Sequence, residues 1–332
     1  MVVEMIKTIA IPACLVAAIV LAAIRPAVPN DEFSEMSESL RLNRIKPRTP
    51  QELRELFRYT GEPMHLVSAH RGGPKARFPE NCIATFENTL EETFAIIEID
   101  PRYAKDGTVV VHHDAMLDRT TTGSGLLCDR TLPELKALRL KDPDGRVTSF
   151  RIPTLDEVLR WARGRTVLVI DQKDVPVEER VRKIEENQAE AFTILIVYNF
   201  RDARKCYDLN KEIMMEVMIP NRAKFWEFDE TGIPWSNIMA FTGHMQPEDP
   251  ELFDMIHAKG ACCIVGTSRN LDRHLAVGRA QGNRDSEQRY RQLLTCGVDV
   301  IETDLPRRIG RLLYGEWDIP ASKAPFFRRR QL

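Results

Sequence analysis

The sequence predicts an α/β protein whose strands form a parallel barrel, preceded by an N-terminal hydrophobic segment and a short capping helix. The first reason is that apolar, β-branched segments alternate with amphipathic helical segments through the second half of the chain. The second is that histidine, arginine and carboxylate side chains stand near the ends of several predicted strands, where a barrel places its site. The 332 residues, 43% of them hydrophobic, suffice for a sizeable core.

The N-terminal segment differs from the rest of the chain. An apolar run of 17 residues, 8–24, lies between Lys7 and Arg25. It is at the lower limit for a membrane span and slightly long for a signal-peptide core. Residues 1–30 are therefore predicted to be a signal peptide or a membrane anchor. Either alternative predicts an exported protein, periplasmic or extracellular, with residues 8–24 as the anchor if the segment is retained.

A polar linker and a capping helix are predicted over residues 31–62. The helix begins with Thr49 as the N-cap and Pro50 in the first turn, ends near Gly61, and is expected to cover one end of the barrel. The barrel is expected over 63–318 and a C-terminal tail over 319–332.

Nine strands are predicted, one too many for an eight-stranded barrel. They are 66–69, 95–100, 108–113, 166–173, 192–198, 213–219, 238–243, 261–267 and 298–304. Helices are predicted at 81–93, 131–140, 154–163, 177–188, 202–209, 251–259 and 284–295. Only seven residues separate Asp100 from Thr108, whereas a parallel crossover needs about a dozen. One of these two strands is thus expected to be an extension outside the barrel, unless a weak late strand is the extra one.

The two strands around Asp106-Gly107 carry the first candidate site. With those two residues as the hairpin loop, Asp100 faces His113, and a one-residue slip would place His112 there instead. Glu98 and Asp100 share a face, because side chains two apart point the same way. Two neighbouring carboxylates repel unless a cation lies between them, so the pattern favours a divalent metal ion over a solvated edge strand.

A second candidate segment is His70-Arg71-Gly72-Gly73, which follows a short apolar strand. Arg71 can bind a phosphate through its planar guanidinium group, and the glycines would let the backbone come close to a ligand. A lone histidine is more often a core or surface residue. His70 and His113, however, stand at two strand ends beside acids, and this suits a proton donor and acceptor pair.

Four motifs resemble the glycerophosphodiester phosphodiesterases, a branch of the phospholipase C-like phosphodiesterase superfamily. They are AHRGGPKARFPEN, EIDPRYAKDGTVVVHHD, LDRTTTGSG and VDVIETDLP, and the likeness covers most of residues 65–305. The resemblance implies a TIM (β/α)8 barrel that binds Ca²⁺ or Mg²⁺. The roles it implies are acid/base catalysis by His70 and His113, metal binding by Glu98, Asp100 and Asp171, phosphate contact by Arg71, and a place at the rim of the site for Glu80.

The chain departs from the family at two places. The family usually carries Glu-x-Lys where this chain has Asp171 and Lys173, so the acid reaches about one methylene less; Lys173 is expected to add positive charge near the phosphate. A Trp-Thr motif of the substrate pocket is replaced by CCIVGTSRNLD. His244, which follows a strand end, is either a replacement for this motif in the pocket or, as the preferred interpretation, a surface residue. Asp304 ends the last strand and shares a face with Glu302.

Metal-dependent hydrolysis of glycerophosphodiesters to glycerol 3-phosphate and an alcohol is the predicted function. The alternatives are a phospholipase D-like enzyme acting on lysophospholipids or sphingolipids, and a catalytically silent barrel used for binding. The expected partner is a small-molecule or lipid-derived phosphodiester, with membrane association through the N-terminal segment. A net charge of −2 argues against nucleic acid. Six cysteines besides Cys14 permit disulfides, and the basic tail could touch anionic lipid or be solvated.

Overall fold

The computed structural model describes residues 42–245, 249, 251–276 and 280–331. The predicted signal peptide or anchor, residues 1–30, lies outside the described residues. In the described part, no helix combines the length and the apolar character needed to span a bilayer.

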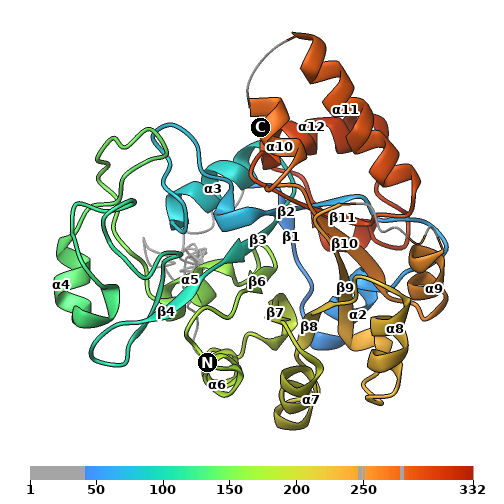
Figure 1. Cartoon of the computed structure of the whole chain (residues 1–332), viewed down its shortest axis with the longest axis horizontal. Coiled ribbons are helices and arrows are strands. Elements are labelled where there is room, and N and C mark those ends of the chain that lie inside the picture. Colours follow the sequence, from blue (N-terminus) through green and yellow to red (C-terminus); the bar gives the residue numbers. More distant parts are fainter. Residues whose placement is uncertain (1–41, 246–248, 250, 277–279, 332) are drawn as a thin grey trace, which may run out of the picture. The chain divides into compact units, whose positions relative to one another are not determined.

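Eight parallel strands close into a barrel at the centre of Figure 1, in the order β10-β11-β2-β3-β6-β7-β8-β9. The strands are β2 (Leu66–Ala69), β3 (Ile96–Ile99), β6 (Leu168–Ile170), β7 (Thr193–Val197), β8 (Met214–Met218), β9 (Ile238–Gly243), β10 (Cys262–Gly266) and β11 (Val300–Thr303). The predicted TIM barrel is therefore confirmed.

Helices surround the barrel strands (Figure 1). They are α3 (Ile83–Glu92), α4 (Leu132–Ala137), α5 (Leu155–Ala162), α6 (Val177–Glu186), α7 (Phe200–Leu209), α8 (Arg222–Asp229), α9 (Leu252–Ala258), α10 (Leu271–Ala276), α11 (Ala280–Thr295) and α12 (Pro306–Glu316). Every predicted helical segment contains a helix, but α8, α10 and α12 were not predicted. A predicted capping box starts α5: Thr154 Oγ1 accepts from Glu157 N, and Thr154 N donates to the Glu157 carboxylate.

The ninth predicted strand lies outside the barrel, as one of the two alternatives stated. β4 (Pro101–Tyr103) and β5 (Val109–Val111) form their own antiparallel pair, in which Pro101 faces Val111. By the same register Asp100 faces His112, and the His112 amide donates to the Asp100 carbonyl at 2.7 Å. The predicted pairing of Asp100 with His113 is therefore wrong.

The physical reason is the length of the hairpin loop. Ala104 pairs with Thr108, so the loop has three residues, and Gly107 takes the left-handed conformation with φ of +80°. This is the three-residue loop with glycine in the αL position, and it shifts the register by one. His112 is consequently buried, where its Nε2 lies 2.8 Å from Thr120 Oγ1.

The other end of the barrel is closed by α2 (Pro50–Phe57) and by a two-stranded sheet of β1 (Arg44–Ile45) and β12 (Phe327–Arg328). Leu53, Leu56 and Phe57 are buried against residues from the barrel interior, which confirms the predicted capping helix. Phe326 and Phe327 are buried in the same cluster, so they are not available for contact with lipid.

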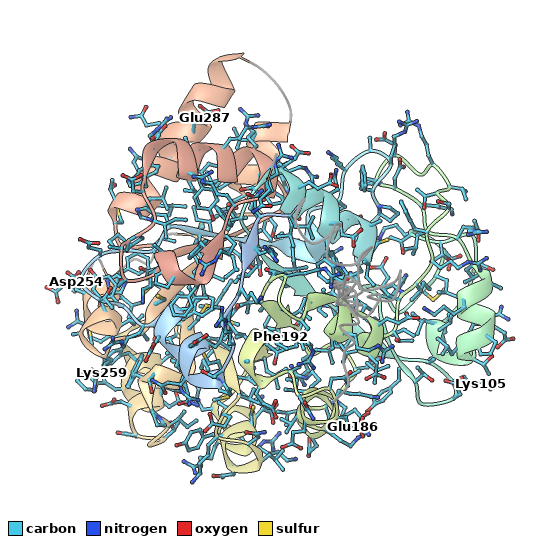
Figure 2. All side chains as sticks on the ribbon, turned by 180° about the vertical axis from the view of Figure 1, so that it is seen from behind. Lys105, Glu186, Phe192, Asp254, Lys259 and Glu287 are labelled. Carbon is cyan, nitrogen blue, oxygen red and sulfur yellow. The ribbon has the colours of Figure 1, made fainter. Side chains whose placement is uncertain are left out.

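Charged side chains cover the outer surface of this barrel. In the view from behind, Lys105, Glu186, Lys259 and Glu287 lie at the periphery, while Phe192 is buried beneath it (Figure 2). The cysteines at 82, 128, 206, 262, 263 and 296 form no disulfide with one another, so the disulfides that the sequence permitted are not formed among the described residues.

Candidate active site

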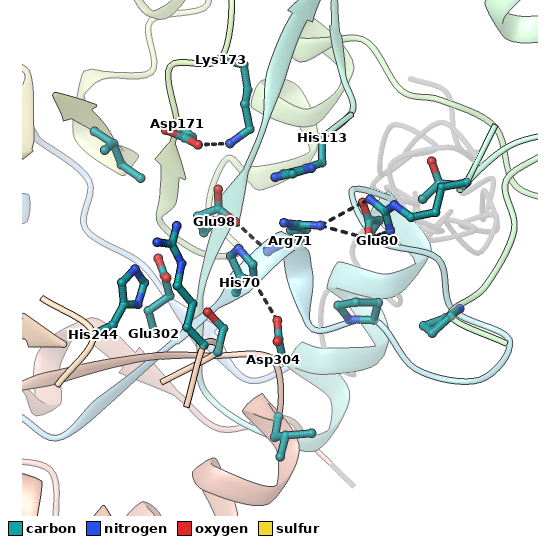
Figure 3. Close-up of a pocket in the computed structure, with 18 of the residues that line it drawn as sticks. His70, Arg71, Glu80, Glu98, His113, Asp171, Lys173, His244, Glu302 and Asp304 are labelled. Carbon is teal, nitrogen blue, oxygen red and sulfur yellow. Dashed lines mark hydrogen bonds and ion pairs between the residues drawn. The ribbon is translucent and has the colours of Figure 1, made fainter. Parts of the chain in front are cut away.

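A pocket of about 880 Å³ opens at the carboxyl ends of the barrel strands. The predicted residues His70, Arg71, Glu80, Glu98, His113, Asp171 and Lys173 line it. Asp100 lies directly behind this wall, with Oδ1 2.9 Å from Lys173 Nζ. Figure 3 shows His70, His113 and Glu98 turned toward one space, with Asp171 and Lys173 beside it. The structure therefore brings all eight sequence-predicted site residues together.

Three buried carboxylates form the centre of the site. Oxygen atoms of Glu98, Asp100 and Asp171 lie within 4.8 Å of one another. The shorter Asp171 therefore still reaches the other two acids. A set of three carboxylate oxygens is what a hard cation such as Ca²⁺ or Mg²⁺ prefers.

Hydrogen bonds hold the three acids in place. Asn81 donates to Asp100 Oδ2 at 2.7 Å and accepts from the Asp100 amide. Glu98 Oε2 accepts from the Arg71 amide at 2.7 Å. The hydroxyl of Tyr198 donates to Asp171 Oδ1 at 2.6 Å.

Lys173 is the cation nearest to this acidic cluster. Its ammonium group contacts both Asp100 and Asp171. Burial alone would raise the pKa of Asp100, but Lys173, His113 and the bond from Asn81 outweigh it and lower that pKa. Burial and the charge of Asp100 raise the pKa of Glu98 well above its usual range. One ammonium therefore does not offset the three negative charges, and the residues fit a bound divalent cation.

Several site residues adopt strained backbone conformations. Arg71, Asn81 and Lys173 have φ values of +51°, +55° and +43°. A non-glycine residue in this region costs about 1–3 kcal/mol, and such residues cluster at functional sites. At Arg71 the strain has a visible result, because this conformation directs the amide toward Glu98.

The glycines after Arg71 have a packing role that was not predicted. Both have positive φ, and a Cβ on Gly72 would lie 2.3 Å from the Phe86 ring, while one on Gly73 would lie 2.2 Å from Pro306. The turn thus needs glycine in order to pack against α3 and α12. The approach of a ligand to the backbone of these two residues stays a prediction.

His70 is paired with an acid on the last strand. Its Nδ1 lies 2.7 Å from Asp304 Oδ1. Burial by itself lowers the pKa of His70, but the bond to Asp304 and the charges of Glu98 and Glu302 outweigh burial and raise it to about 9. His70 is therefore a proton carrier at neutral pH.

His113 has an acid partner too, but that acid is shared. Its Nδ1 lies 2.6 Å from Asp114 Oδ1, and Arg119 donates from Nε to Asp114 Oδ2 at 2.6 Å. Arg119 also makes two hydrogen bonds to Glu80. Burial and the charges of Arg71 and Lys173 lower the pKa of His113, despite opposing contributions from Asp100 and Asp114. At neutral pH His113 is therefore neutral, whereas His70 is protonated.

Sequence reasoning missed several residues of the site. Arg119 lies in the LDRTTTGSG loop, which the resemblance did place at the border of the site. Asn81 stands in the recognised FPEN motif, and Tyr198 is the last residue of a predicted strand. Glu216 lies in the middle of a strand, where alternation alone gave no signal.

The reading of His244 as a surface residue is wrong, because it lines the pocket. Its ring packs edge-on against Phe241 at 5.3 Å. A Cβ on Gly266 would lie 2.4 Å from His244 Nδ1, so the small residue in CCIVGTSRNLD makes room for this imidazole.

Three buried carboxylates between two imidazoles, with cationic side chains at the mouth of a (β/α)8 barrel, are typical of a phosphoric ester hydrolase. The model of the glycerophosphoryl diester phosphodiesterase family matches residues 70–308. The chain belongs to this family, and it is a phosphoric diester hydrolase.

The similarity to individual proteins extends over most of the chain. A glycerophosphodiester phosphodiesterase of Caldanaerobacter subterraneus subsp. tengcongensis is 38% identical over 258 residues, which are 75% of this chain and 97% of that protein. The crystal structure of a glycerophosphoryl diester phosphodiesterase from Parabacteroides distasonis has a TM-score of 0.82 at 37% identity, covering 87% of this chain and 99% of that one. The structure of an Oleispira antarctica phosphodiesterase in complex with its product sn-glycerol-3-phosphate has a TM-score of 0.56 at 22% identity, covering 75% of this chain and 96% of that one. At this identity the likeness shows the fold alone.

Proposed function

We propose that this protein hydrolyses glycerophosphodiesters to sn-glycerol 3-phosphate and an alcohol, with a divalent cation and two histidines. The observation that carries the proposal is the convergence of three buried carboxylates between two imidazoles, each with its own acid partner. The names of the relatives support the choice of substrate class.

The acids Glu98, Asp100 and Asp171 would hold the cation, Ca²⁺ or Mg²⁺. Such a cation, when bound, polarises a phosphoryl oxygen and offsets the negative charge that develops there. Arg71 and Lys173 line the same pocket and bind the remaining phosphate oxygens. Glu80 orients Arg71, since both its oxygens lie 3.4 Å from Arg71 Nη1.

The two histidines have different roles because their acid partners differ. The carboxylate of Asp304 stabilises the protonated form of His70. That imidazole is therefore protonated and donates its proton to the oxygen of the leaving alcohol. Arg119 bonds to Asp114 and offsets its negative charge, so Asp114 stabilises a protonated His113 less. His113 is therefore neutral and accepts the proton of the attacking hydroxyl. That hydroxyl belongs to water or to the neighbouring position of the substrate's own glycerol. In the second case a cyclic phosphate forms as the alcohol leaves, and a water molecule then opens it to glycerol phosphate.

These roles predict a bell-shaped dependence of kcat/KM on pH. Activity rises as His113 loses its proton, at a pH below the ordinary histidine value of 6.5. It falls again at a pH above 6.5, where His70 loses the proton that it must donate, because the bond to Asp304 outweighs burial and raises the pKa of His70. The measurement is initial rate against pH at saturating metal. A profile that only rises up to pH 10 would contradict the role given to His70.

Arg119→Ala tests why His113 is neutral. Without the guanidinium group, the whole charge of Asp114 acts on His113 and raises its pKa. The acid limb of the pH profile is then expected to move up by about 0.5–1 unit. Arg182→Ala is the matched control, because Arg182 pairs with Glu179 on α6, away from the pocket. An unchanged acid limb in Arg119→Ala would refute this explanation.

Product analysis tests the function itself. Purified protein with Mg²⁺ or Ca²⁺ is incubated with glycerophosphocholine and, separately, with lysophosphatidylcholine, and ³¹P NMR follows the products. The expected result is sn-glycerol 3-phosphate from glycerophosphocholine at the higher rate. Preferential cleavage of lysophosphatidylcholine would instead support a phospholipase D-like activity, and release of phosphocholine would contradict the proposed bond.

Export is a separate part of the proposal and rests on the apolar run at residues 8–24. Fusing residues 1–45 to alkaline phosphatase, which is active only after export, is expected to give high activity in a bacterial host. Mass spectrometry of the full chain then distinguishes a cleaved signal peptide from a retained anchor. A fusion that stays inactive would contradict export.

A further inference from the structure

Two more carboxylates reach into the barrel and are not used by the mechanism above. Glu216 is in the middle of β8, paired in register with Ile196 of β7 and Met239 of β9. Glu302 is in β11, paired with Gly266 and Ser68. Their exposed fractions are 1% and 7%, and both line the pocket that contains Glu98 and Asp171.

Glu216 lacks the partners that its neighbours have. Its Oε2 atom is buried and has no hydrogen-bond partner among the described residues. The charges that act on it come from Glu302, Glu98 and Asp171, all of them carboxylates. A buried, ionised carboxylate without a partner costs several kcal/mol, so this side chain needs either a proton or a cation.

The cationic group that acts most on Glu302 is an imidazole that another acid already uses. Its strongest favourable charge interaction is with His70. The Nδ1 atom of His70 is already bonded to Asp304. Figure 3 shows Glu302 beside His70 and His244, facing the same space as Glu98.

The charges of the barrel interior lead to the same conclusion. Five buried carboxylates meet there, namely Glu98, Asp100, Asp171, Glu216 and Glu302. Lys173 and one divalent cation offset three of the five negative charges. Arg71 lies 3.8 Å from Asp100 and also pairs with Glu80, which lies outside this group. These cations therefore act on the side of Asp100 and Asp171, and among the described residues no lysine or arginine forms an ion pair with Glu216 or Glu302.

We propose that this barrel binds a second divalent cation between Glu216 and Glu302, beside the cation of the proposed function. Its ligands are carboxylate oxygens, which suit a hard cation such as Mg²⁺, Mn²⁺ or Ca²⁺. Both residues line the pocket, so this cation is accessible to oxygen atoms of a bound phosphodiester. The pair of cations then stabilises charge on two substrate oxygens, as two-metal sites do. This inference rests on the proposed function for the first of the two cations.

The test is a count of bound Mn²⁺ per chain. Metal-free protein is equilibrated with Mn²⁺ by dialysis, and bound metal is measured by elemental analysis. The wild type is expected to bind two ions, and Glu216→Gln and Glu302→Gln are each expected to bind one, with the second ion weakened at least about tenfold. Glu80→Gln is the matched control. Glu80 lines the same pocket but already pairs with Arg71 and Arg119, so two ions are expected.

Electron paramagnetic resonance gives a second readout that needs no activity. Two Mn²⁺ ions in one barrel are expected to show spin coupling, which Glu216→Gln removes. The metal-free variants should melt close to metal-free wild type, because glutamine keeps the shape of a glutamate that is protonated when no cation is bound. This melting experiment also verifies that the variants fold.

Different outcomes separate this inference from the proposed function. One Mn²⁺ in the wild type, or two ions retained in both glutamine variants, would overturn the second site. If the wild type binds one Mn²⁺ and still hydrolyses glycerophosphocholine, the proposed function stands without the second site. The opposite outcome is also possible. If the wild type binds two ions and each glutamine variant binds one, but the protein hydrolyses no glycerophosphodiester, the second site is supported and the proposed function is refuted.

Discussion

Replacing His113 by alanine should lower kcat for glycerophosphocholine by about 10³-fold, and His70→Ala should have an effect of similar size. The reason is that each variant removes one of the two groups that move a proton during cleavage. Both side chains are partly exposed at strand ends, and each has a single acid partner. The fold should therefore be retained, as circular dichroism and thermal melting can show.

His112→Ala is the matched control for His113→Ala. The two histidines are neighbours in sequence, but His112 is buried and bonded to Thr120. The control is expected to reduce the free energy of unfolding by about 1–3 kcal/mol and to leave kcat of the folded protein within a few fold. An equal loss of kcat in both variants, or nearly full activity in His113→Ala, would refute the assignment.

Removal of divalent metal is expected to abolish activity, with a loss of about 10³-fold or more that Mg²⁺ or Ca²⁺ reverses. Metal-free protein should also melt at a lower temperature, because Glu98, Asp100 and Asp171 then repel one another. Dialysis against a chelator, followed by activity assays and melting curves with each metal added back, measures both effects.

Glu98→Gln is expected to change the activity and the melting temperature of the metal-free protein in opposite directions. It should remove most activity and weaken metal binding, yet raise the melting temperature of the metal-free protein, since one buried charge is gone. Glu55→Gln on α2, whose glutamate lies at the surface of the capping helix, should change neither property. Full activity in a chelator would contradict the account of the acidic centre.

The sequence was sufficient to predict the barrel and the composition of the site. Strands and helices alternate, and the carboxyl ends of parallel strands meet at one end of a barrel, so residues as distant as His70 and Asp171 could be expected to converge. The spacing of Glu98 and Asp100 indicated a shared face, and the structure confirms that their oxygens lie together.

Other features depend on details that sequence patterns do not determine. The register of the hairpin depends on the backbone of its loop. Gly107 has positive φ and Asp106 does not, which gives the longer loop and shifts the register by one residue. Such a shift exchanges the places of His112 and His113. His113 still enters the pocket because β5 ends at Val111, and the chain after it no longer alternates.

Glu216 and His244 show a second kind of limit. An acid in the middle of an otherwise apolar strand can face solvent, a partner or the barrel interior. Only the closed barrel shows that Glu216 points inward. For His244, the absence of a side chain on Gly266 in the neighbouring strand provides the space, and that neighbour is known only from the fold.

The most direct test of the central claim is a crystal structure of the protein grown with Mn²⁺ and sn-glycerol 3-phosphate. The account predicts an anomalous peak within bonding distance of Glu98, Asp100 and Asp171, with the phosphate between His70 and His113. A cation bound away from these acids, or a phosphate that contacts neither imidazole, would contradict it.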